Sequence, residues 1–235
     1  MSGGVFIKTL VVVGHPQIED SSTQQFLKEA AKLPDVTWHS LTGFDVNVTA
    51  EQTLIKQADR LVLQFPLYWY AAPAILKNWL DQVLTRHFAY PDATGGLIGK
   101  ELGTVVTLGS PARNFAAGAS EGYSLSQVMT PFQALAHKLQ MSFLPTFAVD
   151  QFGYQSDEKK AGLLIQYQRY LTQVRLGHFN DQANWLVDRL TKQIAAAPEK
   201  KRQQLTLILE QLKNNQATLE DLQMNLKMIQ DMEDS

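Results

Sequence analysis

The amino-acid sequence predicts an α/β protein in which one parallel sheet lies between layers of helices. Three observations support this prediction. Short apolar runs typical of strands alternate with segments whose apolar residues recur every three or four positions. The alternation repeats along the chain, as it does in sheets built from strand–helix–strand units. The chain has 235 residues, which is enough for one such domain and an extension.

The first strand is predicted at residues 8–14, KTLVVVG, a run closed by glycine that is typical of a strand buried on both faces. The other predicted strands cover residues 36–41, 61–65, 101–108 and 143–149. Helices are predicted at residues 21–32, 51–58, 74–84 and 124–139. Right-handed crossovers give a doubly wound, five-stranded sheet, most simply in the flavodoxin-like order 2-1-3-4-5. Pro145 suits an edge position for the last strand.

The composition changes at about residue 180, where glycine disappears and a helical pattern begins. We therefore expect a domain at residues 1–178 and a helical C-terminal extension at residues 179–235. The extension contains two apolar runs that Asn214 and Asn215 separate, with Pro198 ahead of both. This pattern predicts a helical hairpin or paired helices that pack on the core or on a neighbouring subunit. The apolar residues of the runs are Leu205, Ile208, Leu212, Leu219, Leu222, Leu226 and Ile229.

Charge and composition exclude several classes of function. The net charge of −2 gives no attraction to nucleic acid or to an anionic membrane. The chain has no cysteine, which excludes disulfides and thiolate metal sites and fits a reducing cytoplasm. Its histidines show no spacing typical of metal ligands, and the apolar run near the start is too short for a signal segment or a membrane span. We expect a soluble cytoplasmic protein without a metal.

Ligands of doubly wound sheets bind outside the carboxyl ends of the strands, which directs attention to three loops. The first loop, residues 14–24, matches neither a dinucleotide fingerprint nor a Walker A loop. It offers hydroxyls and backbone N–H groups at a helix N-terminus, which suit a phosphate. Taken alone, the spacing of Ser21 and Gln24 is better explained by a capping box.

The second loop, residues 65–72, has three consecutive aromatic residues between Pro66 and Pro73. The two prolines fix both ends of the loop, because each restricts the neighbouring backbone. Backbone amides of residues 67–70 are then expected to donate to a flat aromatic ring, with Trp69 as an apolar wall. An equally weighted alternative is that Trp69 and Tyr70 fill the core between sheet and helix.

The third loop, residues 107–122, is rich in small residues. Thr107, Gly109 and Ser110 allow the backbone to approach a ligand closely. The alternative for this loop alone is an ordinary flexible connection. Three such loops at one sheet edge support a ligand site more strongly than any one of the loops does alone.

Four segments resemble the flavodoxin-like NAD(P)H:quinone oxidoreductase family, which includes DT-diaphorase and the ancillary oxidoreductase of glutathione-gated potassium efflux. They are HPQIEDSSTQQFL, ADRLVLQFPLYWYAAPAILKNWLDQVL, HFAYPDATGGLIGKELGTVVTLGS and FAAGASEGY. The resemblance runs from about Lys8 to Leu176, is closer to the ancillary type, and does not include the C-terminal helices.

The resemblance implies an enzyme: a flavoprotein that passes two electrons from NAD(P)H to a quinone or another flat aromatic acceptor. The flavin would be FMN, with FAD left open, and the protein would be a homodimer. The alternative is a flavin-binding sensor that regulates a partner such as a membrane potassium-efflux system, and a third option is a domain without cofactor. The implied flavin-binding residues are His15, Ser21, Ser22, Thr23, Gln24, Pro66, Leu67, Tyr68, Trp69, Tyr70, Thr107, Leu108, Gly109 and Ser110.

The third loop departs from the family pattern at two positions. Quinone reductases of this family carry a tyrosine and a histidine there that assist charge handling. Alignment to the ancillary type places Phe115 at the first position and Ser120 at the second. Phe115 cannot donate a proton and Ser120 is a much weaker acid than imidazolium. The resemblance therefore leaves the catalytic residues unknown, and efficient quinone turnover is in doubt.

Overall fold

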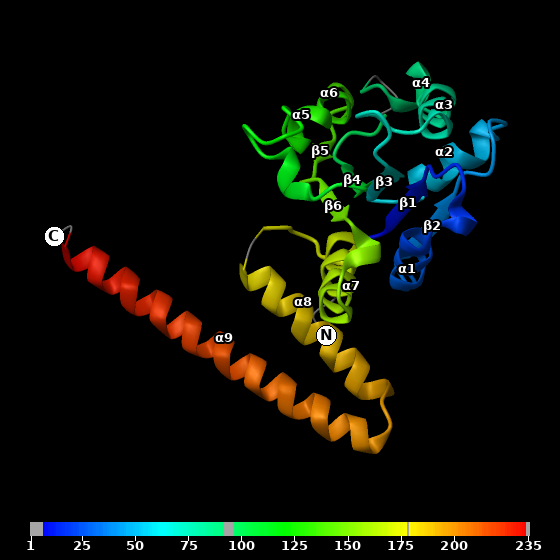
Figure 1. Cartoon of the computed structure of the whole chain (residues 1–235). Coiled ribbons are helices and arrows are strands. Elements are labelled where there is room, and N and C mark those ends of the chain that lie inside the picture. The colour runs from blue at the N-terminus through cyan, green and yellow to red at the C-terminus, as the bar shows by residue number, and fades with distance from the viewer. Residues whose placement is uncertain (1–6, 92–95, 178, 234–235) are drawn as a thin grey trace. The chain divides into compact units, whose positions relative to one another are not determined.

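The computed structural model describes residues 7–91, 96–177 and 179–233. The chain forms two compact units, Met1–Thr172 and Gln173–Ser235. The first unit is an α/β sandwich and the second is a pair of helices, and Figure 1 shows the elements of both. In the described part of the chain, no helix is long and apolar enough to cross a membrane.

The first unit is built on a parallel sheet with the strand order β2-β1-β3-β4-β5, and β6 also pairs with β4. This confirms the predicted flavodoxin-like order. The central strands are buried on both faces, as their continuous apolar runs predict. The strands are β1 (Thr9–Val13), β2 (Val36–Ser40), β3 (Arg60–Pro66), β4 (Glu101–Leu108), β5 (Ser142–Phe143) and β6 (Phe147–Asp150).

The predicted fifth strand, residues 143–149, is divided into β5 and β6. Glu101 pairs with Ser142, whereas Val105 pairs with Phe147, so the register advances by one residue between the two pieces. Pro145 lies in this gap, and proline has no N–H to donate to a ladder. Proline therefore interrupts the edge strand, as its position at the sheet edge allows, and the sheet has six strands instead of five.

Helices cover both faces of the sheet. Helices α1 (Ser22–Ala30) and α7 (Asp157–Thr172) pack together on one face. The opposite face carries α2 (Val48–Gln57), α3 (Ala74–Val83) and α6 (Thr130–Lys138), whose apolar side chains join the main core cluster. Shorter elements are α4 (Arg86–Ala89), α5 (Leu125–Val128) and the 3₁₀ turns η1 (Ile18–Asp20), η2 (Ala112–Phe115) and η3 (Phe152–Tyr154).

Two helices differ from the sequence-based expectation. The helix predicted at residues 124–139 is divided into α5 and α6, because α6 restarts with Pro131 in its first turn, where a missing N–H costs nothing. Helix α7 is not predicted at all. Its buried face consists of Leu163, Tyr167, Tyr170 and Leu171, so tyrosines occupy places where simple apolar periodicity expects aliphatic residues.

The C-terminal end of α7 is held by polar groups of the sheet. Arg60, fully buried at the start of β3, donates from Nη1 to the carbonyl of Tyr170 and from Nε to Glu101 at 2.7 Å. The hydroxyl of Thr9 donates to the carbonyl of Leu171 at 2.6 Å. The last carbonyls of a helix lack intrahelical partners and carry partial negative charge, so a buried cation here both satisfies and stabilises the helix end.

The second unit consists of α8 (Phe179–Ala196) and α9 (Glu199–Glu233), which pack side by side. Paired helices are therefore confirmed, but the turn expected at Asn214 and Asn215 lies instead at Pro198. Asparagine costs a helix only a fraction of a kcal/mol, whereas proline in a helix interior costs about 3 kcal/mol. Gln216 on α9 donates to Asn184 on α8 at 2.9 Å.

We expect Arg60→Met to lower the free energy of unfolding by about 3–5 kcal/mol, because it leaves Glu101 and the end of α7 without their buried partner. Urea denaturation followed by near-ultraviolet circular dichroism measures this change. Lys77→Met is the matched control, since it breaks the exposed ion pair with Asp81 on α3 and should cost less than about 1 kcal/mol. Equal effects of the two substitutions would contradict the anchoring role of Arg60.

Candidate functional site

The three loops singled out in the sequence meet at one edge of the sheet. All strands are parallel, so their carboxyl ends lie at the same edge. Gly14 donates its N–H to the carbonyl of Gln64 at 2.9 Å, which ties the first loop to β3. Leu67 donates to the carbonyl of Thr107 at 3.0 Å, which ties the second loop to the third. The carboxyl edge is therefore the candidate site.

The close approach of the first loop to α3 requires glycine at position 14. A Cβ atom there would lie 2.5 Å from the Cβ of Leu76, a residue of α3. No side chain fits at that distance. Gly14 thus allows α3, and the second loop that leads into it, to lie against the end of β1.

The second loop contains a two-residue turn with an unusual backbone. Tyr68 and Ala71 exchange two backbone hydrogen bonds, both 3.0 Å long. Between them Trp69 and Tyr70 have φ angles of 49° and 61°. A tight turn with two positive φ angles favours Asn-Gly, and each bulky residue in this region costs about 1–2 kcal/mol. Backbone strain of this kind is concentrated at functional sites.

The aromatic side chains of this turn do not fill the core. Trp69 is 94% exposed, Tyr70 is 50% exposed and Tyr68 is 48% exposed. This finding removes the alternative that Trp69 and Tyr70 fill the space between sheet and helix. A strained backbone that holds a large aromatic side chain in solvent has no benefit for packing, so it points to a contact outside this chain.

The amides of the turn are only partly available as donors. The N–H of Leu67 and that of Tyr68 are used in the backbone bonds described above. The N–H groups of Trp69 and Tyr70 meet no acceptor among the described residues. The four donors expected from the sequence are therefore reduced to two neighbouring ones, those of Trp69 and Tyr70.

The first loop divides its polar residues between two roles. The hydroxyl of Ser21 accepts from the N–H of Gln24 at 3.3 Å, so the cap is present. The N–H groups and hydroxyls of Ser22 and Thr23 meet no partner among the described residues. Such groups at the start of a nine-residue helix suit an anion.

The side chain of Gln24 is buried instead of facing the loop surface. Its Oε1 accepts from Nε2 of Gln64 at 2.6 Å, and Oε1 of Gln64 accepts from the hydroxyl of Tyr167 at 2.7 Å. The Nε2 of Gln24 is buried and has no partner among the described residues. A donor of this kind costs about 1–3 kcal/mol when it remains unsatisfied.

His15 is half-buried beside this helix start. Its Nδ1 accepts from the N–H of Gln17 at 3.1 Å. Burial lowers the pKa of the imidazole. The lowered pKa favours the neutral imidazole, so His15 does not supply a permanent positive charge to the first loop. Within the described residues, no group of three or more acidic or histidine side chains is placed to hold a metal ion.

The two departures in the third loop lie in different surroundings. Phe115 is buried, and its ring contacts that of Tyr70 edge-on at 6.5 Å between centroids. Ser120 is exposed in a turn. Phe115 thus packs against Tyr70 of the second loop, whereas Ser120 is exposed to solvent.

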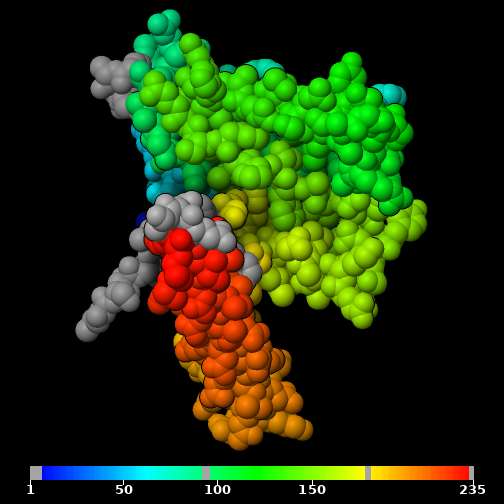
Figure 2. Space-filling model, turned by 90° about the vertical axis from the view of Figure 1, so that its left-hand side faces the viewer, coloured from blue at the N-terminus to red at the C-terminus, as the bar shows by residue number. Residues whose placement is uncertain are grey.

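Glu121 joins the second and third loops and is not among the residues predicted from the sequence. Its Oε2 accepts from the hydroxyl of Tyr70 at 2.8 Å, and its Oε1 accepts from Ser110 at 3.5 Å. The hydrogen bond to this carboxylate, and then its negative charge, raise the pKa of the Tyr70 hydroxyl. No local pattern marks Glu121, because its partner Tyr70 lies 51 residues away in the chain. Figure 2 shows the face formed largely by the green segments that include this loop.

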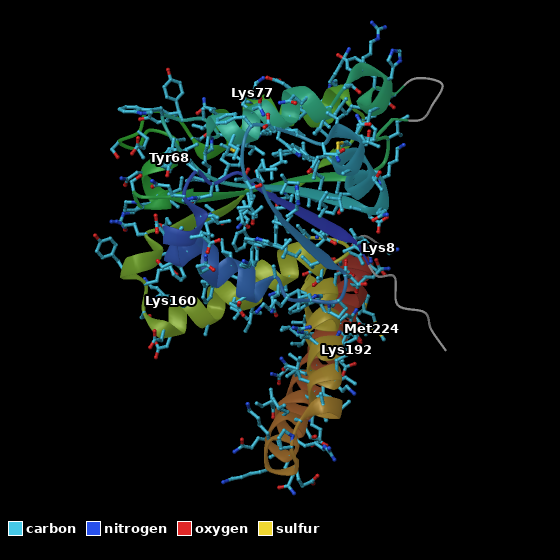
Figure 3. All side chains as sticks on the ribbon, turned by 90° about the vertical axis from the view of Figure 1, so that its right-hand side faces the viewer. Lys8, Tyr68, Lys77, Lys160, Lys192 and Met224 are labelled. Atoms are coloured by element: carbon cyan, nitrogen blue, oxygen red, sulfur yellow. The ribbon has the colours of Figure 1, made fainter. Side chains whose placement is uncertain are left out.

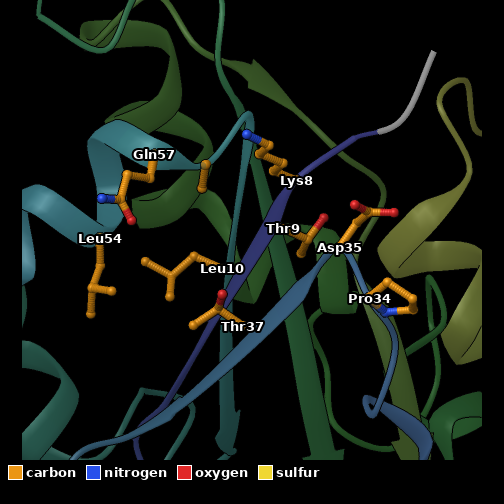
Figure 4. Close-up of a pocket in the computed structure, with 9 residues that line it drawn as sticks. Lys8, Thr9, Leu10, Pro34, Asp35, Thr37, Leu54 and Gln57 are labelled. Atoms are coloured by element: carbon orange, nitrogen blue, oxygen red, sulfur yellow. The ribbon is translucent and has the colours of Figure 1, made fainter.

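The described residues of the first unit line a cavity at each end of the strands. One, of about 430 Å³, lies at the amino ends of β1 and β2 and is drawn in Figure 4. Figure 3 labels Lys8 near that cavity and Tyr68 at the opposite end of the strands, so none of the three loops borders it. The other, of about 410 Å³, adjoins the strained turn and is lined by Tyr70, Glu121, Tyr123, Gln127 and Val128.

The residues at the carboxyl edge fit a flavin. Ser22 and Thr23 offer donors for a phosphate, and Trp69 and Tyr70 offer two N–H groups for acceptors at the edge of a flat ring. The exposed indole of Trp69 offers an apolar surface beside them. The distribution of donors matches a ligand that is anionic at one end and aromatic at the other.

Two curated proteins are similar to this chain over most of their length. A curated protein of Bacillus subtilis named as an uncharacterized NAD(P)H oxidoreductase, YdeQ, is 39% identical over 175 residues, which are 72% of this chain and 89% of that protein. The potassium-efflux ancillary protein KefG of Cronobacter sakazakii is 34% identical over 70% of this chain and 92% of its own length.

Several solved structures are similar to this chain, and they include an NADPH-quinone reductase and a general stress protein. An NADPH-quinone reductase from P. pentosaceus has a TM-score of 0.69 and 46% identity, and covers 72% of this chain and all of its own. The general stress protein 14 of Treponema denticola, solved in complex with FMN, has a TM-score of 0.63 and 32% identity over 70% of this chain and 97% of its own.

A family model described as a flavodoxin-like fold matches residues 7–174, which include all three loops and end before α8. The chain therefore belongs to this flavodoxin-like family, whose members similar to it include proteins named as NAD(P)H oxidoreductases and NADPH-quinone reductases.

Proposed function

We propose that this protein is a flavin-dependent NAD(P)H oxidoreductase that binds FMN and reduces a quinone or a similar flat aromatic acceptor. The observation that carries the proposal is the strained Trp69–Tyr70 turn, which presents two unpaired N–H donors and an exposed indole at the carboxyl edge. The similarity of the chain to an NADPH-quinone reductase and to a protein solved with FMN supports the same assignment.

The flavin supplies hydride and electron transfer, and the chain supplies binding and orientation. Ser22 and Thr23 would hold the phosphate at the start of α1. The N–H groups of Trp69 and Tyr70 would hold acceptor atoms at the ring edge, where fixed donors also stabilise negative charge. Thr107 and Ser110, at the end of β4, would border the ring from the third loop.

The chain offers few groups for proton transfer to an acceptor. Phe115 has no hydroxyl, and Ser120 is exposed and weakly acidic. The raised pKa keeps the Tyr70 hydroxyl protonated, and that hydroxyl already donates to Glu121. We infer that protons reach the reduced acceptor from solvent through the open site, so quinone reduction does not need a dedicated acid in this chain.

A regulatory role is the second candidate. KefG is named as an ancillary protein of a glutathione-regulated potassium-efflux system, and the missing acid at positions 115 and 120 fits a protein with little turnover. In that case the first unit would bind flavin and signal its redox state to a membrane efflux partner. We also propose that the flavin domain spans residues 1–178 and that the protein is a cytoplasmic homodimer.

Steady-state NAD(P)H oxidation by the FMN-loaded protein separates these two functions. We expect oxidation to accelerate when a neutral quinone is added, and we expect the purified protein to show the absorption spectrum of bound flavin. Flavin binding without quinone-dependent turnover would support the regulatory role. Failure to bind any flavin would contradict both proposals.

We predict that Trp69→Asn weakens FMN affinity and raises the stability of the flavin-free protein. Asparagine tolerates a positive φ, so the substitution relieves strain worth about 1 kcal/mol while it removes the indole. Trp69→Ala is the matched control, because it removes the indole and leaves the strain. Calorimetric titration with FMN and thermal unfolding of the flavin-free variants measure the two effects. Unchanged FMN affinity in both variants would contradict the role of the second loop.

We predict that the double substitution of Ser22 and Thr23 by alanine weakens FMN affinity, because hydrogen bonds to a charged group contribute about 1.5–3 kcal/mol each. Ser21→Ala removes the cap instead, and should lower the stability of the flavin-free protein by about 1 kcal/mol. Comparison of the two variants by FMN titration and by urea denaturation separates anion binding from capping. A double variant with native FMN affinity would show that the phosphate binds elsewhere.

A further inference from the structure

The cavity of about 410 Å³ beside the strained turn contains polar groups that flavin binding does not use. Tyr70 lines it from the second loop and Glu121 from the third loop. Tyr123 lines it from the segment before α5, and Gln127 and Val128 line it from α5. Tyr70 and Tyr123 are half exposed or more, so their rings are accessible to a ligand. The cavity therefore combines aromatic surface with one carboxylate.

The carboxylate of Glu121 carries a charge that the structure leaves uncompensated. Its two oxygens accept only from hydroxyls, those of Tyr70 and Ser110. Among the residues that the structure describes, no lysine, arginine or histidine forms an ion pair with it. Hydroxyl donors orient a carboxylate but do not cancel its charge, so Glu121 contributes a negative charge to the cavity lining.

We propose that this cavity receives the electron acceptor and that Glu121 selects flat aromatic acceptors which carry a positive charge. The proposal rests on the proposed function, since it places the acceptor next to the turn that would hold the flavin. The faces of two tyrosine rings attract a cation, and the carboxylate adds a direct charge attraction. The same carboxylate would repel an anionic acceptor and so lower its affinity for the cavity.

A structural role for Glu121 can be separated from a role in selection. The Tyr70 hydroxyl donates to Glu121, and the side-chain carbonyl of glutamine can also accept a hydrogen bond from it. Glu121→Gln therefore keeps the link between the two loops and removes only the charge. If Glu121 served the link alone, this variant would behave as the native protein toward acceptors of every charge.

The test uses three naphthoquinones with the same ring, one neutral, one with a trimethylammonium group and one with a sulfonate. With the FMN-loaded native protein we expect kcat/KM to be about tenfold or more higher for the cationic quinone than for the anionic one. Near water, a unit charge a few ångströms from the carboxylate changes the affinity about severalfold, in opposite directions for the two quinones. In Glu121→Gln this ratio should fall to about one to two, because the charge that distinguishes the cationic from the anionic quinone is gone. In the native protein the ratio should also shrink at high salt.

A gain-of-charge variant provides the matched control. Gln127 lines the same cavity and forms a capping box with Ser124 at the start of α5. Glutamate serves in such a box as well as glutamine does, so Gln127→Glu adds a second carboxylate without loss of the helix start. This variant should increase the preference for the cationic quinone, and combined with Glu121→Gln it should restore part of the preference.

Failure of this inference is distinguishable from failure of the proposed function. If the neutral quinone is reduced and the cation-to-anion ratio is the same in the native protein and in Glu121→Gln, selection by Glu121 is wrong and the oxidoreductase function stands. If the neutral quinone is not reduced at all, the oxidoreductase function is wrong. In that case calorimetric binding of the two charged quinones to the flavin-free protein decides, and equal affinities or no binding of the cation would overturn the inference.

Discussion

The hydrogen bond from the guanidinium of Arg60 to the end of α7 is the first of a series of buried polar contacts that extends to the candidate site. Arg60 and Thr9 hold the last carbonyls of α7, and α7 places Tyr167 above β3. Tyr167 donates to Gln64, which donates to Gln24 in the first turn of α1. The start of α1 is the part of the first loop that carries unpaired donors, so its position depends on a cation at the other end of the sheet.

Polar groups in a core are costly unless they are paired. In this series of contacts Arg60 holds the end of α7, and Gln64 on β3 joins Tyr167 on α7 to Gln24 on α1. Gly103 on β4 contributes to the same arrangement, because a Cβ atom there would lie 2.5 Å from the hydroxyl of Tyr170. The sheet face under α7 is thus specified by hydrogen bonds and by close approach, whereas the opposite face is specified by apolar packing around Trp79, Leu76 and Phe65. A shift of α7 would disturb the first face alone.

The parts of the fold that follow from simple periodicity could be predicted from the sequence. Apolar runs and the preference for right-handed crossovers predict the strand order, and the order is confirmed. Features that depend on tertiary polar contacts could not be predicted. Helix α7 was missed because Tyr167 and Tyr170 replace aliphatic residues, and Pro145 divides the edge strand in a way that its pattern of residues does not reveal.

The candidate site shows the same division. The three loops and the aromatic turn could be found from glycines, prolines and the rule for doubly wound sheets, but the conformation of the turn could not. Positive φ angles at Trp69 and Tyr70 contradict the preferences of both residues, and they decide which amides remain as donors. Glu121 could not be found because nothing near it in sequence indicates that Tyr70 will be its partner.

The two unpaired amides of the strained turn have a consequence for hydrogen exchange. Backbone N–H protons that lack an acceptor and lie at an exposed turn exchange with solvent deuterium without any prior opening of the structure. A ring seated against Trp69 and Tyr70 would slow both protons together, while the amide of Leu67, bonded to Thr107, would keep its own rate. The exchange rates of the Trp69 and Tyr70 amides would therefore report whether the site is occupied, for ligands without visible absorption as well as for coloured ones.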